Sequence, residues 1–175
     1  MLKSITFKQN YRCFKKGQKF SFEPLTLLVG DQGSGKSSLL ELLATNNTKI
    51  LEIDASPIAT RAFDYEKDNP RKGKDVYTTL DIAVRVVSHG QFVRQLNESI
   101  CEQAGVCWLQ DEPDASLSIR SCYKLAANFK TALANKCQVI AAVHSQALLE
   151  QFPKVLSLEH LKWMSTGEFI KEQLR

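Results

Sequence analysis

Hydrophobic and polar residues alternate along the chain with two different periods, and each change of period marks a predicted element. Residues 3–9 and 18–24 alternate every second residue and predict a small antiparallel pair of strands. Residues 25–29 (LTLLV) form a continuous apolar run closed by Gly30, which predicts a buried strand. Residues 37–46 then place leucines at helical spacing. The chain therefore opens with three strands and a helix.

The rest of the chain continues this alternation of strand and helix patterns. Apolar runs predict three further strands, at residues 49–54, 104–110 and 137–143. Helical spacing predicts three further helices, at residues 91–103, 117–135 and 145–152. Residues 64–75 have almost no apolar side chains and predict an exposed loop. Strands that alternate with helices indicate an α/β domain with a mostly parallel sheet flanked by helices.

Composition narrows the class of protein without identifying it. The chain has 175 residues, of which 43% are hydrophobic, and this size suits one globular domain over residues 1–175. Its apolar runs are well short of the roughly 20 residues that a membrane-spanning helix needs, and the first ten residues do not resemble a signal peptide. We therefore expect a soluble, cytoplasmic protein that does not associate with membranes.

The net charge and the cysteine content argue against several other classes of protein. The formal net charge of +4 is too small to indicate nucleic-acid binding by itself. The five cysteines are odd in number and show no C-x-x-C spacing, so we expect neither a disulfide framework nor a zinc site. The three histidines lack ligand spacing with the cysteines, which argues against a metal or redox enzyme.

A glycine-rich turn joins the predicted strand at 25–29 to the predicted helix that follows it. Residues 30–37 read GDQGSGKS and match the G-x-x-x-x-G-K-[S/T] phosphate-loop pattern in the strand–turn–helix context that confirms it. The glycines let backbone N–H groups face an anion, and the helix N-terminus adds the positive end of its dipole. We expect an exposed Lys36 to bind the β- and γ-phosphates of ATP and Ser37 to bind Mg²⁺. The predicted nucleotide-binding residues of this loop are Gly30, Asp31, Gln32, Gly33, Ser34, Gly35, Lys36, Ser37 and Ser38.

Two adjacent carboxylates, Asp111 and Glu112, follow the predicted strand at 104–110, and Pro113 stops that strand. In phosphate-loop NTPases a carboxylate at such a strand end supports Mg²⁺, so we assign this role to Asp111. Glu112 can act as general base on an attacking water if it points at the γ-phosphate. The alternative for an isolated D-E-P sequence is a polar turn after a strand.

Two further segments contain candidate contacts for the phosphates of ATP. Ser88, Gly90 and Gln91 open the predicted helix at 91–103, where Ser88 and Gln91 have capping-box spacing and the helix N-terminus can face an anion. His144 follows the last predicted strand, where its imidazole can hydrogen-bond a phosphate or the attacking water. A structural role is the alternative for this histidine.

Four segments together resemble the ABC ATPases, and more closely the soluble SMC/RecF/OLD-like branch, which includes compact AAA-family predicted ATPases of bacteria and phages. Besides the phosphate loop, SHGQ at 88–91 resembles the signature motif, WLQDEPDASLS at 108–118 resembles the Walker B motif and D-loop, and AAVHS at 141–145 resembles the switch-histidine segment. The opening NYRCFKKGQKFSF at 10–22 is similar to the N-F-R-S-F segment of the RecF-like branch. The resemblance covers most of the chain.

This resemblance implies a P-loop NTPase fold with a small N-terminal antiparallel portion, and a head-to-tail homodimer that closes on ATP. Ser88 and Gly90 of one subunit would contact the γ-phosphate held by the phosphate loop of the other, and hydrolysis would open the dimer. It also implies that Arg12 approaches a phosphate and that an aromatic residue, Tyr11 or Phe14, stacks on adenine. Ordinary packing and a solvated arginine are the alternatives for these three residues.

The chain departs from the family pattern at two points. It has no glutamine between Ser38 and Gly90, so the Q-loop glutamine has no counterpart, and Asp64, Glu66 and Asn69 are the alternatives for its role. The segment between the phosphate loop and SHGQ is also short and has no heptads. It therefore has no room for long coiled-coil arms or for a full transporter-coupling subdomain.

Three functions remain open at this point. The first is an ATP hydrolase whose dimer opens and closes, and the second is an ATP-dependent module that binds DNA or a partner protein with slow turnover. For the second, Arg61, Lys67 and the RKGKD segment at 71–75 are candidate phosphate contacts. The third is a small-molecule kinase, against which the S-H-G-Q, D-E-P and His144 set argues, because a kinase needs an acceptor pocket and a lid.

Overall fold

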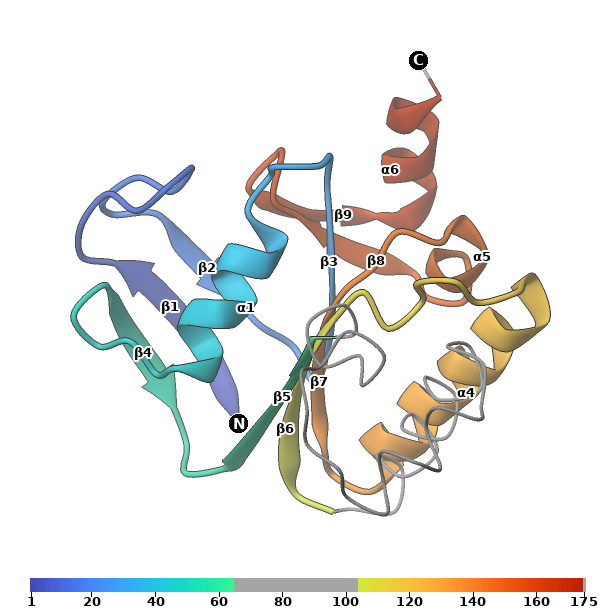
Figure 1. Cartoon of the computed structure of the whole chain (residues 1–175), viewed down its shortest axis with the longest axis horizontal. Helices are drawn as coiled ribbons and strands as arrows, with labels where there is room; N and C mark the ends of the chain where they lie inside the picture. The colour runs from blue at the N-terminus through green and yellow to red at the C-terminus, as the bar shows by residue number, and fades with distance from the viewer. Residues whose placement is uncertain (65–103, 175) are drawn as a thin grey trace, which may run out of the picture.

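The computed structural model describes residues 1–64 and 104–174, which form two β-sheets and the helices that pack on them (Figure 1). The first half of the chain contains β1 (Leu2–Phe7), β2 (Lys19–Ser21), β3 (Leu25–Val29), α1 (Lys36–Ala44), β4 (Leu51–Ala55) and β5 (Ala59–Asp64). The second half contains β6 (Val106–Asp111), α4 (Ile119–Ala134), β7 (Gln138–Ala142), α5 (Gln146–Leu149), β8 (Lys154–Ser157), β9 (Lys162–Ser165) and α6 (Thr166–Gln173).

The larger sheet is mostly parallel and has the strand order β5-β6-β7-β3-β8-β9. Strands β5, β6, β7, β3 and β8 run parallel to one another, and only β9 is antiparallel to its neighbour β8. The parallel strands β6 and β7 have matching ends, with Asp111 paired to Ala142. The residues that follow these two strands therefore meet at one edge of the sheet, beside the turn that follows β3.

The smaller sheet is antiparallel and has the order β2-β1-β4. It confirms the antiparallel pair predicted near the start of the chain, and it adds β4, which pairs with β1. The buried amide of Gln138 at the start of β7 ties this sheet to the larger one, because it accepts from the Leu2 N–H and donates to the Leu2 carbonyl, both at 2.8 Å. Strand β1 is thus joined to β7, an interior strand of the larger sheet.

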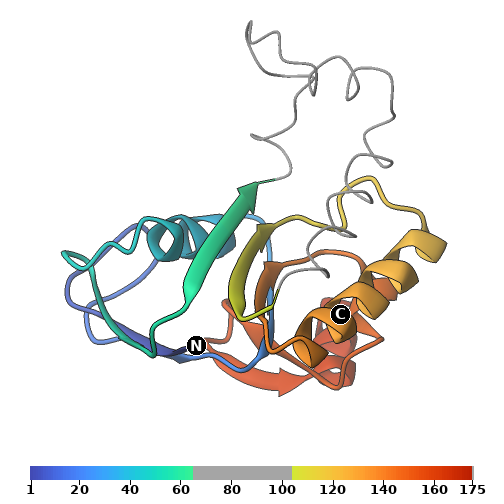
Figure 2. The same cartoon turned by 90° about the horizontal axis from the view of Figure 1, so that it is seen from below.

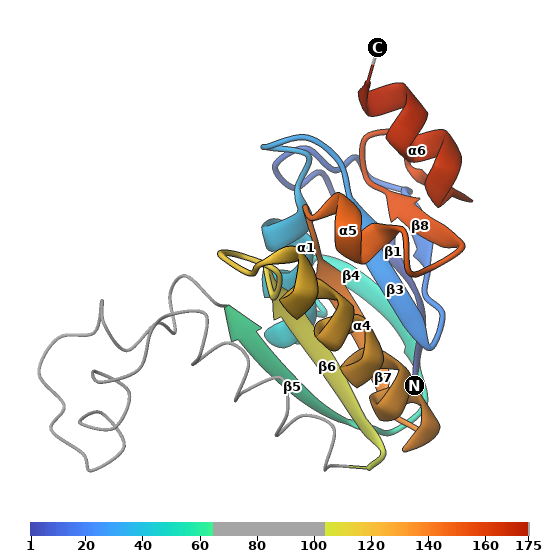
Figure 3. The same cartoon turned by 90° about the vertical axis from the view of Figure 1, so that its right-hand side faces the viewer.

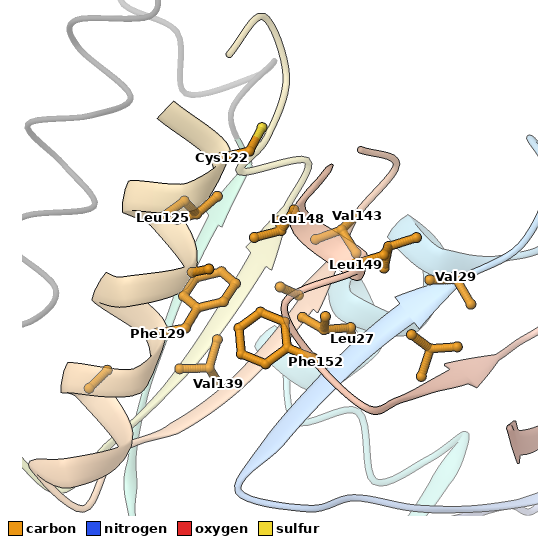
Figure 4. Close-up of a cluster of buried hydrophobic side chains, with 14 of the residues drawn as sticks. Leu27, Val29, Cys122, Leu125, Phe129, Val139, Val143, Leu148, Leu149 and Phe152 are labelled. Carbon is orange, nitrogen blue, oxygen red and sulfur yellow. The ribbon is translucent and has the colours of Figure 1, made fainter. Parts of the chain in front are cut away.

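The hydrophobic core consists of one cluster on each face of the larger sheet. On one face, α4 and α5 pack against alternate residues of β3 and β7, as the side chains of Leu125, Phe129, Val139 and Phe152 show (Figure 4). On the other face, α1 lies between the two sheets, so that α1 and α4 flank the larger sheet from opposite sides (Figures 2 and 3). Complete burial of such an aliphatic or aromatic side chain contributes roughly 1.5–3 kcal/mol relative to its exposure.

These elements confirm most of the predicted ones and add several. The predicted strand at 25–29 matches β3. The predicted helices at 37–46, 117–135 and 145–152 overlap α1, α4 and α5, which have shorter or shifted ends. Strands β5, β8 and β9 and helix α6 did not stand out in the hydrophobic pattern. The predicted helix at 91–103 lies outside the described residues, and of the predicted loop at 64–75 only its first residue, the last of β5, is described.

Candidate functional site

The turn between β3 and α1 contains the phosphate-loop sequence. Gly30, Gly33 and Gly35 have φ angles of 138°, 86° and 98°, which lie in the region that favours glycine. Gly35 is the N-cap of α1, and among residues 1–64 and 104–174 no side chain caps the first turn of this helix. The first backbone N–H groups of α1 are therefore available to an anion, as expected for a phosphate loop.

Gly35 is required for space as well as for its backbone conformation. A Cβ atom at this position would lie 2.5 Å from Cys13 Sγ and 2.7 Å from Cζ of Phe14. Both contacts come from the loop between β1 and β2, which therefore lies directly against the phosphate loop. Gly33 has a similar positive φ, but a Cβ there would meet no atom within 4 Å.

We predict that Gly35→Ala destabilises the protein more than Gly33→Ala does. Either substitution places a side chain in the left-handed region at a cost of about 1 kcal/mol, but only Gly35→Ala also overlaps two side chains, which adds about 1–3 kcal/mol. For a chain of this size, 1 kcal/mol corresponds to about 2–4 °C in Tm. Thermal unfolding of the two variants measures the difference, and equal Tm values would contradict the close packing at Gly35.

Lys36 is buried rather than exposed. Only 6% of the residue is accessible, and its ammonium group donates to the carbonyl oxygens of Gly30 at 2.7 Å and Asp31 at 3.1 Å. Burial lowers the pKa of Lys36, while the nearby carboxylates of Asp111 and Glu112 act in the opposite direction. The expectation that Lys36 is exposed is therefore wrong, because its amine donates to two carbonyl oxygens of the phosphate loop itself.

Glu112 and His144 lie side by side at the ends of β6 and β7. The Glu112 N–H donates to the carbonyl of Ala142 at 3.0 Å, and Glu112 has a positive φ of 56°. Its Oε1 lies 3.4 Å from Nε2 of His144, and 44% of the Glu112 side chain and 49% of the His144 side chain are accessible. Both side chains can therefore meet a ligand that enters at the phosphate loop.

Asp114 holds the backbone of His144 in place, which the sequence did not suggest. Its Oδ2 accepts hydrogen bonds from the N–H of His144, at 2.8 Å, and from the N–H of Ser145, and the residue is 7% exposed. The turn after β6 is therefore fixed to the turn after β7. The only sequence feature that could have indicated this role of Asp114 was the third carboxylate in D-E-P-D. By itself, that feature does not distinguish a residue that binds the backbone from one in a solvated turn.

Two neighbouring cavities meet at this edge of the sheet. The first, of about 310 Å³, is lined by residues of the phosphate loop, by Arg12 and Cys13, and by Glu112 and His144. The second is larger, about 560 Å³, and lies between the phosphate loop and α6. They share Gln32, Glu112 and His144. We assign the phosphates to the smaller cavity, because Lys36 and Ser37 line it and do not line the larger one.

The loop between β1 and β2 brings Arg12 to the mouth of the smaller cavity. The Arg12 Nη1 donates to the Ser38 hydroxyl at 2.6 Å and lies 3.3 Å from Glu41 Oε2, and its guanidinium carbon lies 5.2 Å from the centre of the Tyr11 ring. Phe14 is 2% exposed and stacks on Phe7. Stacking of Phe14 on adenine is therefore ruled out by its packing, whereas Tyr11 is half-buried with Arg12 over its ring.

Several predicted site residues are not part of the described structure. Ser88 and Gly90 lie outside the described residues, as do Glu66 and Asn69. Asp64 ends β5, and its backbone pairs with Asp111. Within residues 1–64 and 104–174, no group of three or more His, Cys, Asp and Glu side chains could hold a metal ion.

Comparisons with known proteins support the fold and, for the first part of the chain, an ATPase domain. Residues 1–85, slightly less than half of the chain, match the AAA ATPase domain family. The fold is similar to that of cbiO1 from Clostridium perfringens, part of the ABC transporter complex cbiONQ, with a TM-score of 0.60 and 13% identity over 98% of this chain and 92% of that one. A comparison with curated proteins found no match.

Two further structures show the same likeness. A putative metal-chelate type ABC transporter in an inward-facing conformation has a TM-score of 0.56 and 14% identity over 96% of this chain and 85% of that one. A bacterial Atm1-family ABC exporter with ATP bound has a TM-score of 0.57 and 15% identity over 98% of this chain and 40% of that one.

The fold is thus that of the nucleotide-binding domains of ABC proteins, an α/β P-loop NTPase fold with a mostly parallel sheet and a small antiparallel one. Together with the family match, it supports an ATPase of the ABC/AAA type. No relationship to the SMC/RecF/OLD-like branch in particular emerges from these matches. In the part of the chain that the structure describes, no helix is both long and apolar enough to cross a membrane.

Proposed function

We propose that residues 1–175 form one ATP-binding domain that hydrolyses ATP to ADP and phosphate. The observation that carries this proposal is the single cavity lined by Lys36 and Ser37 of the phosphate loop and by Glu112 and His144 at the neighbouring strand ends. A phosphate-binding turn alone would fit many nucleotide-binding proteins. A carboxylate and an imidazole 3.4 Å apart in the same cavity add the groups that activation of a water requires.

The oxygen donors at this site suit Mg²⁺. Ser37 is exposed in the smaller cavity. Asp111 ends β6 close enough to Lys36 that its charge opposes the lowering of the Lys36 pKa by burial. One hydroxyl and one carboxylate are a typical protein contribution to Mg²⁺, which takes its remaining ligands from phosphate oxygens and water. Mg²⁺ bound there would neutralise charge that develops on the phosphates.

The residues of the site divide the reaction between them. Lys36 moves from the carbonyls of Gly30 and Asp31 to the phosphates, and the N–H groups of the first turn of α1 bind the same oxygens. Glu112 accepts a proton from the water that attacks the γ-phosphorus, and the bond to the ADP oxygen breaks. His144 donates a hydrogen bond to the γ-phosphate, and the two hydrogen bonds that Asp114 accepts fix its position.

We further propose that two copies of the chain close head to tail on ATP, with Ser88 and Gly90 of one copy against the γ-phosphate of the other, and that hydrolysis opens the dimer. Charge-assisted hydrogen bonds across such an interface last only while the γ-phosphate is present. A protein of this kind needs no membrane-spanning part and works in the cytoplasm. An ATP-dependent binding module with slow turnover remains the second candidate, because Arg12, which lines the smaller cavity, belongs to the loop between β1 and β2, where Lys15 and Lys16 are also exposed.

Phosphate release from ATP and Mg²⁺ without any added acceptor tests the hydrolase. We expect steady release that depends on Mg²⁺. A small-molecule kinase would release almost no phosphate until an acceptor was supplied, so acceptor-dependent turnover would contradict the proposal. Nucleotide binding without turnover would favour the binding module.

We predict that His144→Ala lowers kcat by about 10²-fold or more and changes nucleotide affinity much less. The imidazole would stabilise charge that develops mainly in the transition state, which affects the rate more than binding. His160→Ala is the matched control, since His160 pairs with Glu172 at 2.8 Å and lines neither cavity. Equal losses of kcat and affinity in His144→Ala would assign His144 a structural role.

A further inference from the structure

Positive charge is concentrated at one end of the chain. Residues 1–22 contain six of the 23 Lys and Arg residues and none of the 19 acidic residues. The rest of the chain therefore has a net charge of −2, although the whole chain has +4. The modest total charge conceals this segregation.

Five of these six cations lie in one surface segment. The segment at residues 8–19, here called the basic loop, joins β1 to β2 and includes the first residue of β2. In Figure 1 it is the dark blue connection at the same end of the molecule as the turn between β3 and α1. Its basic residues are Lys8, Arg12, Lys15, Lys16 and Lys19, and all five are exposed.

Hydrogen bonds fix the backbone of the basic loop. The Asn10 side chain accepts from the Lys16 N–H at 2.8 Å, and the Gln18 side chain accepts from the Lys15 N–H at 2.7 Å. Tyr11 and Phe14 exchange two backbone hydrogen bonds of 2.9 Å, and the buried Phe14 ring anchors the loop to the core. The loop thus presents its cations from an ordered backbone, which lowers the entropic cost of binding.

Three of the cations have no protein partner in the described structure. Lys8 donates to the Thr48 carbonyl, and Arg12 contacts Ser38 and Glu41. Across residues 1–64 and 104–174, no hydrogen bond or ion pair engages the ammonium groups of Lys15, Lys16 and Lys19. An anion can therefore bind these lysines without displacing a partner.

We propose that the basic loop is a binding surface for the phosphodiester backbone of nucleic acid. Closely spaced lysines that have no acidic neighbours in the sequence bind phosphates through charge, without needing a particular base sequence. The proposal goes beyond ATP hydrolysis and does not rest on it, because Lys15, Lys16 and Lys19 line neither of the two cavities at the phosphate loop. The candidate phosphate contacts at 71–75 lie outside the described residues and are not part of this proposal.

The composition of the loop argues against the other polyanionic partners. A membrane-binding surface adds exposed apolar side chains to its basic ones, and the exposed large hydrophobic residues of the described structure all lie elsewhere, at Met1, Ile119, Tyr123, Leu161 and Leu174. An acidic protein would meet aromatic or apolar residues at the centre of its interface. Phe14 is buried and Tyr11 is half-buried. The loop therefore exposes charged side chains but lacks the exposed aromatic or apolar residues that form the centre of a protein interface.

The test measures the affinity of the nucleotide-free protein for a labelled 30-base-pair DNA duplex and for a 30-nucleotide single strand, by fluorescence anisotropy at several salt concentrations. The variant Lys15→Gln/Lys16→Gln/Lys19→Gln removes the three unpartnered charges. The control Lys124→Gln/Lys162→Gln/Lys171→Gln removes the same charge from exposed lysines of α4, β9 and α6. Thermal unfolding and nucleotide affinity show that both variants are folded.

We expect the unchanged protein to bind at least one of the two DNAs, with log K falling linearly with log salt concentration. The basic-loop variant should bind at least about 10-fold more weakly in low salt, and its salt slope should shrink by about 2–3, one unit per lost phosphate contact. The control should keep most of the slope. Equal losses in both variants, no binding to either DNA, or binding to phosphatidylglycerol vesicles in place of DNA would each overturn the proposal. ATPase activity does not enter these measurements, so a failed hydrolase proposal leaves this test intact.

Discussion

Glu112→Gln is expected to lower ATP turnover by about 10²–10⁴-fold, because an amide cannot accept the proton of the attacking water. The substitution keeps the size of the side chain and one acceptor oxygen. The hydrogen bond from the Glu112 backbone N–H to Ala142 does not depend on the side chain, so the turn should keep its shape. Single-turnover measurements with ATP and Mg²⁺ report the loss.

The same variant should also change the oligomeric state. With the γ-phosphate intact, the closed head-to-tail dimer should accumulate, and removal of a negative charge beside the triphosphate favours it further. Light scattering coupled to size exclusion, at micromolar protein with ATP and Mg²⁺, should show a dimer. Adding Ser88→Arg should restore the monomer, because a bulky side chain blocks the contact in trans without touching the phosphate loop.

A monomeric Glu112→Gln protein that has bound ATP would contradict the dimer mechanism. If ATP turnover of this variant is still lost, the protein would be a phosphate-loop NTPase that acts as a monomer. Unchanged turnover would instead remove Glu112 from the reaction. The two measurements therefore test the proposed base and the proposed dimer separately.

Lys36→Ala is expected to weaken ATP binding by about 100-fold, since a charged hydrogen bond to a phosphate contributes about 1.5–3 kcal/mol. The burial of Lys36 adds a second effect. Its removal leaves the carbonyls of Gly30 and Asp31 without their donor and opens space beside α1. A loss of about 1–2 kcal/mol in folding stability should accompany the loss of binding.

Lys36→Met separates the two effects of this substitution. Methionine retains an unbranched stem of similar length and lacks the charge, so it should lose ATP binding as fully as Lys36→Ala while losing less stability. Titration with a fluorescent ATP analogue measures binding, and thermal unfolding measures stability. ATP binding at the parent affinity in either variant would show that the phosphates bind elsewhere.

The sequence predicted the elements that can be recognised from residues close together in the chain. The strand at 25–29, the glycine turn and the helix that follows could be recognised because apolar spacing, glycines and a lysine all lie within a few residues. β5 was missed for the opposite reason. Ala59, Thr60, Arg61 and Ala62 are exposed, and their strand conformation follows from pairing with β6, which no local pattern reveals.

The positions of the site residues were only partly predictable. Glu112 and His144 each follow a predicted strand, which indicated that both lie near the phosphate loop. Their contact with each other depends on β6 and β7 being neighbours in the sheet. The burial of Lys36 depends on loop carbonyls that fold around its amine. The role of Asp114 depends on two backbone N–H groups about 30 residues further along the chain.

The position of β3 in the sheet has a consequence for the protein during its synthesis. Both neighbours of β3, namely β7 and β8, come more than 100 residues later in the chain. As the phosphate loop leaves the ribosome, the strand that carries it has no partner in its sheet, and pairing over such a sequence distance is slow. Both neighbours of β3 are complete only after residue 157, the end of β8, has been translated. Truncated products of translation that end before residue 157 therefore lack part of the sheet that flanks the phosphate-loop strand.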